Sequence, residues 1–184
     1  YHLRNGDIYA VTERPGEQAS EQRLYTSTDH GVWRISSMAF ADSTLYLVGY
    51  DQFNNNEALI GTCVRGKLQP DGQRSWETVF VTDTLPLSRT AFDHRFNALA
   101  IHPGGDTLYI NSGSRTDHGE SHQGFREIPL TSCIFQIPAD ATNLHLQNDS
   151  SWLAQQGYLF VDGVRNTFDL AFSPQGHLFG PENA

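Results

Sequence analysis

The apolar and polar positions of the chain form short strand-like runs and no long helical stripe. One pattern occurs three times: an apolar strand, a turn, and a second apolar strand. The copies are Met38–Gly49, Leu99–Asn111 and Leu170–Phe179. Because the turns contain Asp, Gly, Pro or Ser and the flanking runs are short, each copy is predicted to form a β-hairpin.

The three hairpins share two markers. In the first strand an alanine stands between two larger apolar residues, and the second strand resumes with leucine and an aromatic residue. The alanines are Ala39, Ala100 and Ala171, which are 61 and 71 residues apart. Hairpins repeated at such long intervals are typical of β-propellers, and a small alanine suits the crowded strands near a propeller axis. A β-sandwich whose hairpins repeat by coincidence is the alternative.

Further strands are expected between the hairpins, at Asp7–Thr12, Leu24–Ser27, Ala58–Val64, Glu77–Thr82, Cys133–Pro138 and Tyr158–Val161. Loops are expected at Glu13–Gln22, Asp51–Glu57, Gly66–Arg74, Ser112–Gly124 and Ala139–Ser150. A short helix is expected over Trp152–Gln156, because Asn148-Asp149-Ser150 supplies N-cap residues. The predicted fold class is therefore all-β, with one partial β-propeller domain over residues 1–184.

The number of hairpins bears on assembly. Propellers usually have at least four blades, so three hairpins are expected to form about half of a larger propeller. The open edges of such a half are expected to favour self-association, because an unpaired strand edge can pair with another chain.

Composition narrows the choice of partners. The formal net charge is −9 over 184 residues, and an acidic surface repels phosphate backbones, so nucleic acid is not an expected partner. No run approaches the roughly 18 apolar residues of a membrane-spanning helix, and the first residues show no apolar segment of a signal peptide. Cys63 and Cys133 lie in apolar runs outside any C-x-x-C motif, so two buried thiols are expected, with a disulfide as the alternative.

Two segments carry a resemblance to a known family. In His94–Ser114 a histidine precedes an apolar strand, a Pro-Gly-Gly-Asp turn, a Leu-Tyr strand and a Gly-Ser end. In Gly163–Ala184 the run Gly-Val-Arg-Asn precedes Leu-Ala-Phe, a Pro-Gln-Gly turn and Gly-Pro-Glu-Asn. These segments resemble the soluble quinoprotein glucose/sorbosone dehydrogenases, which are PQQ-dependent aldose sugar dehydrogenases. The resemblance covers roughly the second half of the chain, and the first half shares only the hairpin repeat.

The resemblance implies a six-bladed β-propeller, of which this chain supplies about three blades, and an oxidoreductase activity. Enzymes of the family use PQQ and calcium to oxidise an aldose or related sugar at the anomeric carbon to the lactone, with the hydride passing to PQQ. The expected partners are therefore a small-molecule sugar and an external electron acceptor. The resemblance also implies a periplasmic or secreted location.

Four residues match functional positions of the family. The match makes His94 the general base, a role that suits imidazole because its pKa lies near neutral pH. Arg165 is expected to stabilise charge on the reduced quinone and, with Asn166, to bind PQQ. The backbone carbonyl of Ala184 is a candidate calcium ligand, and the next ligand would lie beyond it. In a neighbouring loop, Arg115 is a further candidate for holding the cofactor.

Plainer interpretations of these residues stay open. His94 could be a loop histidine beside Asp93, and Arg165 could pair with Asp162 or Asp169. The chain also departs from the family, because Ser114 stands where the family has an acidic residue. Asn97-Ala98 replaces Gly-Arg and Ala184 replaces Gly, again relative to the family pattern.

The loop Ser114–Glu120 is dense in polar residues. It is either a solvated loop or a ligand-binding loop in which Asp117, His118 and Glu120 ligate a metal or line the sugar pocket.

Two other functions remain alternatives to a dehydrogenase. One is a non-catalytic propeller that binds sugar or protein, which the serine at position 114 favours. The other is a calcium-dependent, lactonase-like propeller hydrolase, which would need carboxylates such as Glu182 and Asp117 as metal ligands. A third interpretation is that the chain is an inactive fragment of an active parent.

Overall fold

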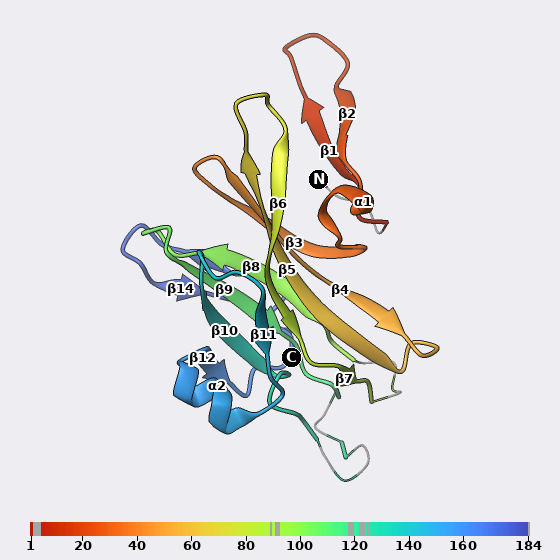
Figure 1. The fold of residues 1–184 in the computed structure, drawn as a ribbon, viewed down its shortest axis with the longest axis vertical. Coiled ribbons are helices and arrows are strands. Elements are labelled where there is room, and N and C mark those ends of the chain that lie inside the picture. The colour runs from red at the N-terminus through yellow and green to blue at the C-terminus, as the bar shows by residue number, and fades with distance from the viewer. Residues whose placement is uncertain are drawn as a thin grey trace.

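Strands dominate the computed structural model of the protein (Figure 1). The structure describes residues 1, 5–88, 90, 93–117, 120, 121, 124 and 126–183. Strands take 48% of the residues and helices 6%, so the predicted all-β class is confirmed. Within these ranges, neither helix has the length and apolarity that crossing a lipid bilayer requires.

The two larger sheets each contain four antiparallel strands that follow one another in chain order. The first contains β3 (Arg34–Ala41), β4 (Thr44–Phe53), β5 (Ala58–Leu68) and β6 (Arg74–Thr82). The second contains β8 (Phe96–Ile101), β9 (Thr107–Ser112), β10 (Cys133–Pro138) and β12 (Leu159–Asp162). Two short strands extend the first sheet: β7 (Leu85–Pro86) pairs with β5, and β11 (Leu144–Leu146) lies parallel to β6.

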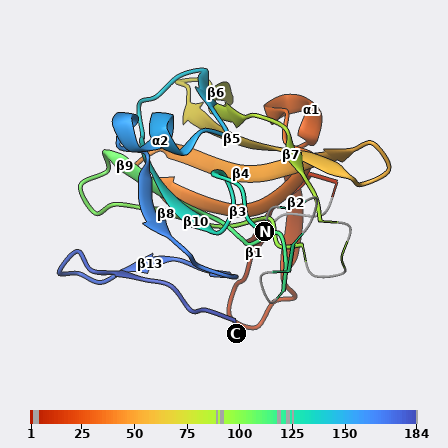
Figure 2. The same ribbon diagram turned by 90° about the horizontal axis from the view of Figure 1, so that it is seen from below.

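Two separate hairpins and two helices complete the described fold. The hairpins are β1 (Ile8–Thr12) with β2 (Ser20–Tyr25), and β13 (Ala171–Phe172) with β14 (Leu178–Phe179). The helices are α1 (Ser27–His30) and α2 (Ser150–Gln156). Figure 2 shows the β13–β14 hairpin as a separate layer beside β8, which β13 contacts.

The repeat found in the sequence is a repeat in strand pairing. In every copy the marker alanine stands opposite the aromatic residue of the second strand: Ala39 pairs with Tyr46, Ala100 with Tyr109, and Ala171 with Phe179. The three predicted hairpins are thereby confirmed as β3–β4, β8–β9 and β13–β14. Their first strands are neighbours, because β8 packs against both β3 and β13.

The core follows from the alternation of side chains along these strands, which sends successive residues to opposite faces. The largest cluster lies between the two four-stranded sheets and contains Val48, Phe80, Leu108 and Phe135. The opposite face of the first sheet packs against Ile8 of β1, while a third cluster joins the second sheet to the β13–β14 hairpin. Each four-stranded sheet is therefore buried on two faces.

Both cysteines lie in the central cluster. Cys63 and Cys133 are fully buried, and both are free thiols. The predicted pair of buried thiols is confirmed, and the alternative of a disulfide is wrong. Burial raises the pKa of both thiols, which keeps them protonated and unreactive at neutral pH.

The structure corrects the predicted boundaries in several places. Strand β4 extends to Phe53 and β5 to Leu68, so both enter the expected loops Asp51–Glu57 and Gly66–Arg74. The expected loop Ala139–Ser150 contains β11, and β2 begins at Ser20 inside another expected loop. Short edge strands such as β11 depend on a partner far away in the chain, here β6, so their local sequence carries little signal. The strand expected over Leu24–Ser27 ends at Tyr25, because Asp29 accepts from the Thr26 amide (2.7 Å) and starts α1.

The expected helix near residue 152 is present as α2. The Asp149 carboxylate accepts a hydrogen bond from the Trp152 amide (2.9 Å), as an N-cap residue should. Gly157 ends the helix in the left-handed conformation, with φ of 70°.

A buried arginine ties the first sheet to the chain that follows β10. Arg65, on β5, has a side chain only 6% exposed. Its Nη1 donates to the carbonyl oxygens of Ala139 (2.7 Å) and Ala141 (2.9 Å), and its Nη2 donates to Thr142 Oγ1 (2.8 Å). Glu77 supplies the counter-charge at 2.8 Å. One side chain thus donates to three acceptors in the segment that follows β10.

Candidate functional site

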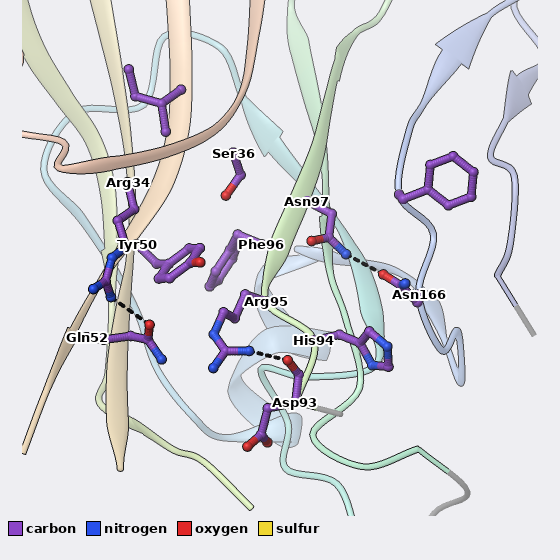
Figure 3. Close-up of a pocket in the computed structure, with 12 residues that line it drawn as sticks. Arg34, Ser36, Tyr50, Gln52, Asp93, His94, Arg95, Phe96, Asn97 and Asn166 are labelled. Carbon is purple, nitrogen blue, oxygen red and sulfur yellow. Dashed lines mark hydrogen bonds between the residues drawn. The ribbon is translucent and has the colours of Figure 1, made fainter. Parts of the chain in front are cut away.

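A polar cleft of about 940 Å³ opens beside the first strands of the repeat. Three parts of the chain form it: β3 with β4, the start of β8, and the segment before β13 (Figure 3). The side chains that line it are mostly polar, and they are Arg34, Ile35, Ser36, Tyr50, Gln52, Asp93, His94, Arg95, Phe96, Asn97, Asn166 and Phe168.

Equivalent positions of the three repeats line this cleft. The residues three to five places before each marker alanine are 34–36, 95–97 and 166–168, and all but Thr167 are in the lining. The cleft therefore lies where β3 and β8 begin and where the chain leads into β13. The repeat that builds the fold also builds the site.

His94 precedes β8, and its ring is held by Ser114. Nδ1 lies 3.0 Å from the Ser114 hydroxyl oxygen and 3.2 Å from the Ser114 carbonyl oxygen. The Ser114 hydroxyl donates its hydrogen to the carbonyl of Thr116 (2.7 Å), so towards the imidazole it acts as an acceptor. This network assigns the hydrogen to Nδ1 and leaves the lone pair on Nε2.

The surroundings of His94 favour the neutral imidazole. Partial burial lowers the pKa of His94, and the positive charge of Arg165 lowers it further, while the hydrogen bond to Ser114 and the charge of Asp93 oppose the shift. The net direction is below the usual value of 6.5. At neutral pH the ring is therefore able to accept a proton at Nε2.

His94 is a loop residue whose Nδ1 is satisfied, as the plainer interpretation expects, but the partner is Ser114 and Asp93 acts on the ring only through its charge. The buried Asp93 carboxylate accepts hydrogen bonds from the Ser88 amide at 2.9 and 3.1 Å. Gly113 fixes His94 from the other side, because a Cβ at this glycine would lie 2.4 Å from the Cβ of His94. Position 113 therefore has to be glycine for the ring to keep its place.

Asn166 enters the cleft from the segment between β12 and β13. Its side-chain oxygen accepts a hydrogen bond from Asn97 Nδ2 (2.6 Å), which joins two walls of the cleft (Figure 3). Glu182 clasps the same segment, because its carboxylate accepts from the amides of Arg165 and Asn166 and from the Thr167 hydroxyl, each at 2.6 Å.

The ionisation of Glu182 fits this clasping role. Burial opposes its charge, but the hydrogen bonds from Thr167 and from the two amides outweigh burial, so the pKa of Glu182 is lowered. The ionised carboxylate thus accepts hydrogen bonds from all three residues of the Arg165–Thr167 segment.

Arg165 lies beside the cleft and is not part of its lining. Its guanidinium pairs with Asp117, donates through Nε to the Asp117 carbonyl (2.9 Å), and donates through Nη1 to the Asn183 carbonyl (2.6 Å). The partner is therefore Asp117, and neither Asp162 nor Asp169 takes that position. Through its charge Arg165 still acts on the imidazole of His94.

Arg115 is buried behind His94, with 3% of its surface exposed. It borders a small cavity together with His94 and Arg95, and its Nε has no hydrogen-bond partner among the described residues. Burial lowers its pKa, and the charges of Glu127 and Asp93 partly offset this effect. Its predicted role at the cofactor stays a prediction, since it does not border the larger cleft.

Only some of the predicted metal ligands belong to the described residues. Ala184 and His118 lie outside the described residues, so neither prediction is tested. In the described part of the chain no group of three or more His, Cys, Asp and Glu side chains could hold a metal ion. Asp117 is paired with Arg165, and Glu182 with its own segment.

Several lining residues were not anticipated from the sequence. Arg34, Tyr50 and Gln52 come from the first half of the chain. Arg95 follows His94 directly in the sequence but was not among the predicted site residues. The phase of the repeat could have identified two of them, because Arg34 and Arg95 both stand five places before a marker alanine.

We expect Ser114→Asp to raise the pKa of His94 by about one pH unit or more, because a carboxylate beside Nδ1 stabilises the imidazolium. The pH titration of the His94 Cε1 resonance by NMR measures this value. Ser114→Ala is the matched control, since it keeps the backbone carbonyl acceptor and adds no charge. A pKa that Ser114→Asp leaves unchanged would contradict the assigned contact.

Comparison of the chain with models of known protein families gives no match, and neither does comparison with curated protein sequences.

Proposed function

We propose that the protein is a β-propeller oxidoreductase that binds PQQ in the cleft and, with calcium, oxidises an aldose sugar at the anomeric carbon to the lactone. One observation carries the proposal. His94, with its lone pair on Nε2, and Asn166, which is 72 residues further along the chain, both line one polar cleft. These are residues that the resemblance assigned to the same site.

The arrangement of the sheets supports the propeller part of the proposal. Propeller blades are four-stranded sheets that surround a central channel. Here two sheets, each built around four antiparallel strands in chain order, pack face to face, with β7 and β11 added to the first. The first strands of successive repeats are neighbours. The β13–β14 hairpin then corresponds to the first two strands of a further blade, whose open edge favours self-association.

The chemistry of the lining suits PQQ. The cofactor carries three carboxylates and an electron-poor quinone, and it needs donors of hydrogen bonds. The amides of Asn97 and Asn166 can supply them, and Arg165 adds positive charge beside the cleft. A cleft of about 940 Å³ lies within the usual range for cofactor sites.

The fit of calcium is weaker. The side chains in the described ranges form no cluster that could hold a cation, so any calcium would depend on backbone oxygens such as that of Ala184. Calcium binding therefore stays a prediction from the resemblance, as do the periplasmic or secreted location and the external electron acceptor.

In the proposed reaction His94 removes the proton of the anomeric hydroxyl. Nε2 accepts this proton while Nδ1 remains bonded to Ser114, so the ring keeps its orientation as it becomes charged. PQQ, when bound, supplies the acceptor for the hydride that leaves the anomeric carbon. Asn97 and Asn166 would hold the cofactor, and the hydrogen bond from Asn97 Nδ2 to the Asn166 side-chain oxygen fixes both side chains before it binds.

One observation favours a second candidate, a propeller that binds sugar without oxidising it. The guanidinium of Arg165 is committed to Asp117 and Asn183, so in this arrangement it does not reach into the cleft to stabilise a reduced quinone. A sugar-binding module should not take up PQQ, and this difference separates the two candidates.

The test is a calorimetric titration of PQQ into the protein with calcium present. We expect the wild-type chain to bind and Asn166→Asp to weaken binding by at least about tenfold, because it puts a negative charge among the cofactor carboxylates. This variant keeps the acceptor for Asn97 Nδ2, so the wall of the cleft is preserved. Asn143→Asp, at an exposed position outside the cleft, is the matched control. Absence of binding by the folded wild-type chain would overturn the proposal.

A further inference from the structure

Two arginines of the cleft share one tyrosine ring. The guanidinium carbons of Arg34 and Arg95 each lie 5.9 Å from the centre of the Tyr50 ring. Figure 3 shows the three side chains together with Gln52, which accepts from Arg34 Nη1 (2.6 Å). Because the two arginines occupy equivalent positions of two repeats, the fold itself brings both guanidinium groups to the same tyrosine ring.

These two charges have no ion-pair partner among the described residues. Arg34 donates to the neutral amide of Gln52, and Arg95 donates to the backbone carbonyl of Asp93. The Asp93 carboxylate accepts from the Ser88 amide. Asp51 interacts with the charge of Arg34 over a longer distance, without an ion pair among the described residues. Two half-buried cations that line the cleft therefore have no carboxylate in direct contact among the described residues.

An anion is the ligand that such a pair accepts best. A guanidinium presents parallel N–H groups that match the two oxygens of a carboxylate, and two of them can hold one carboxylate firmly. The surrounding side chains of Ser36, Gln52 and Asn97 are neutral hydrogen-bonding groups that suit hydroxyls. Phe168, 55% exposed at the rim, offers an apolar surface for the face of a sugar ring.

The position of this cluster separates it from the proposed cofactor end of the cleft. Arg34 and Tyr50 lie on β3 and β4 (Figure 3). Across the cleft are His94, which precedes β8, Asn97 on β8, and Asn166 in the segment before β13. Arg95, next to His94 in the chain, reaches from that side to the Tyr50 ring. A ligand with an anomeric hydroxyl at one ring carbon and a carboxylate on another can contact both sides at once. Uronic acids have this structure.

We propose that Arg34, Tyr50 and Arg95 form a carboxylate-binding subsite that selects acidic sugars, so the substrate class is a uronic acid. This inference rests on the proposed function for its reaction, but the binding step can be measured without the cofactor. The subsite contributes affinity for the carboxylate, while His94 and Asn166 act at the other end of the sugar.

The experiment compares galacturonate with galactose, the matched neutral sugar, by calorimetric titration into the protein without PQQ. We expect galacturonate to bind at least about tenfold more tightly, since a hydrogen-bonded charge pair is lost with galactose. Arg34→Gln and Arg95→Gln should each abolish most of this preference. Arg14→Gln, an exposed arginine in the turn between β1 and β2, should leave it unchanged. Equal affinities for the two sugars in the wild-type protein overturn the inference.

A second arm separates the sugar from the cofactor as the source of the carboxylate. Arg34→Lys and Arg95→Lys keep the charge and lose the planar fork, so they also guard against misfolding of the glutamine variants. We expect them to weaken galacturonate binding and to leave PQQ binding within about threefold of wild type. Loss of PQQ affinity with an intact preference for galacturonate would mean that the arginines hold the cofactor, which overturns the inference. Asn166→Asp should weaken PQQ binding and leave the preference for galacturonate unchanged. Failure of the subsite and failure of the cofactor site therefore give different results.

Discussion

His94→Gln is expected to lower kcat for sugar oxidation by about 10²- to 10⁴-fold, the usual contribution of a positioned general base. The glutamine side chain can still donate to the Ser114 oxygens that now accept from Nδ1, but it has no basic nitrogen at the position of Nε2. Binding of PQQ should therefore survive while proton removal is lost.

Steady-state reduction of a dye acceptor, with PQQ and calcium supplied, measures this effect. His177→Gln is the matched control, because His177 is exposed in the turn of the β13–β14 hairpin and is not part of the cleft. A His94→Gln variant that keeps the wild-type kcat would show that another group removes the proton.

Arg65→Met is expected to lower the free energy of unfolding by about 2–4 kcal/mol, because each buried carbonyl that loses its donor costs about 1–3 kcal/mol. Methionine fills much of the same space but leaves the carbonyls of Ala139 and Ala141 without their donor. The loss should be large because this guanidinium joins β5 to a segment more than 70 residues further along the chain.

Urea denaturation gives the comparison, with Lys67→Met as the matched control. Lys67 pairs with the same carboxylate, Glu77, at 3.2 Å, but its side chain is 48% exposed. An exposed pair of this kind contributes about 0–1 kcal/mol. If both variants lost the same small amount of stability, Arg65 would not be the structural link that its contacts indicate.

The part of the fold that could be predicted is the part that depends on neighbours in sequence. A hairpin is specified by two short apolar runs and the turn between them, so the repeats around Ala39, Ala100 and Ala171 were visible in the sequence. The N-cap of α2 at Asp149 was visible for the same reason. By contrast, β11 forms only because β6 is beside it, and the sequence of residues 144–146 does not predict that pairing.

The residues of the candidate site could be predicted only where they belong to a segment that resembles a known family. His94 and Asn166 belong to the two segments that resemble the dehydrogenase family, and both line the cleft. Arg34 and Tyr50 come from the half of the chain that shares only the hairpin repeat, so their place opposite His94 required the tertiary structure. The direction of the Arg165 side chain also depended on a long-range partner, Asp117, which is 48 residues earlier.

The most direct test of the account is an NMR titration of PQQ, with calcium present, into protein labelled at the histidine ring carbons. The account predicts that the His94 resonance shifts on binding and that those of His145 and His177, which lie outside the cleft, do not. Saturation with PQQ that leaves the His94 resonance in place would contradict the claim that this cleft is the cofactor site.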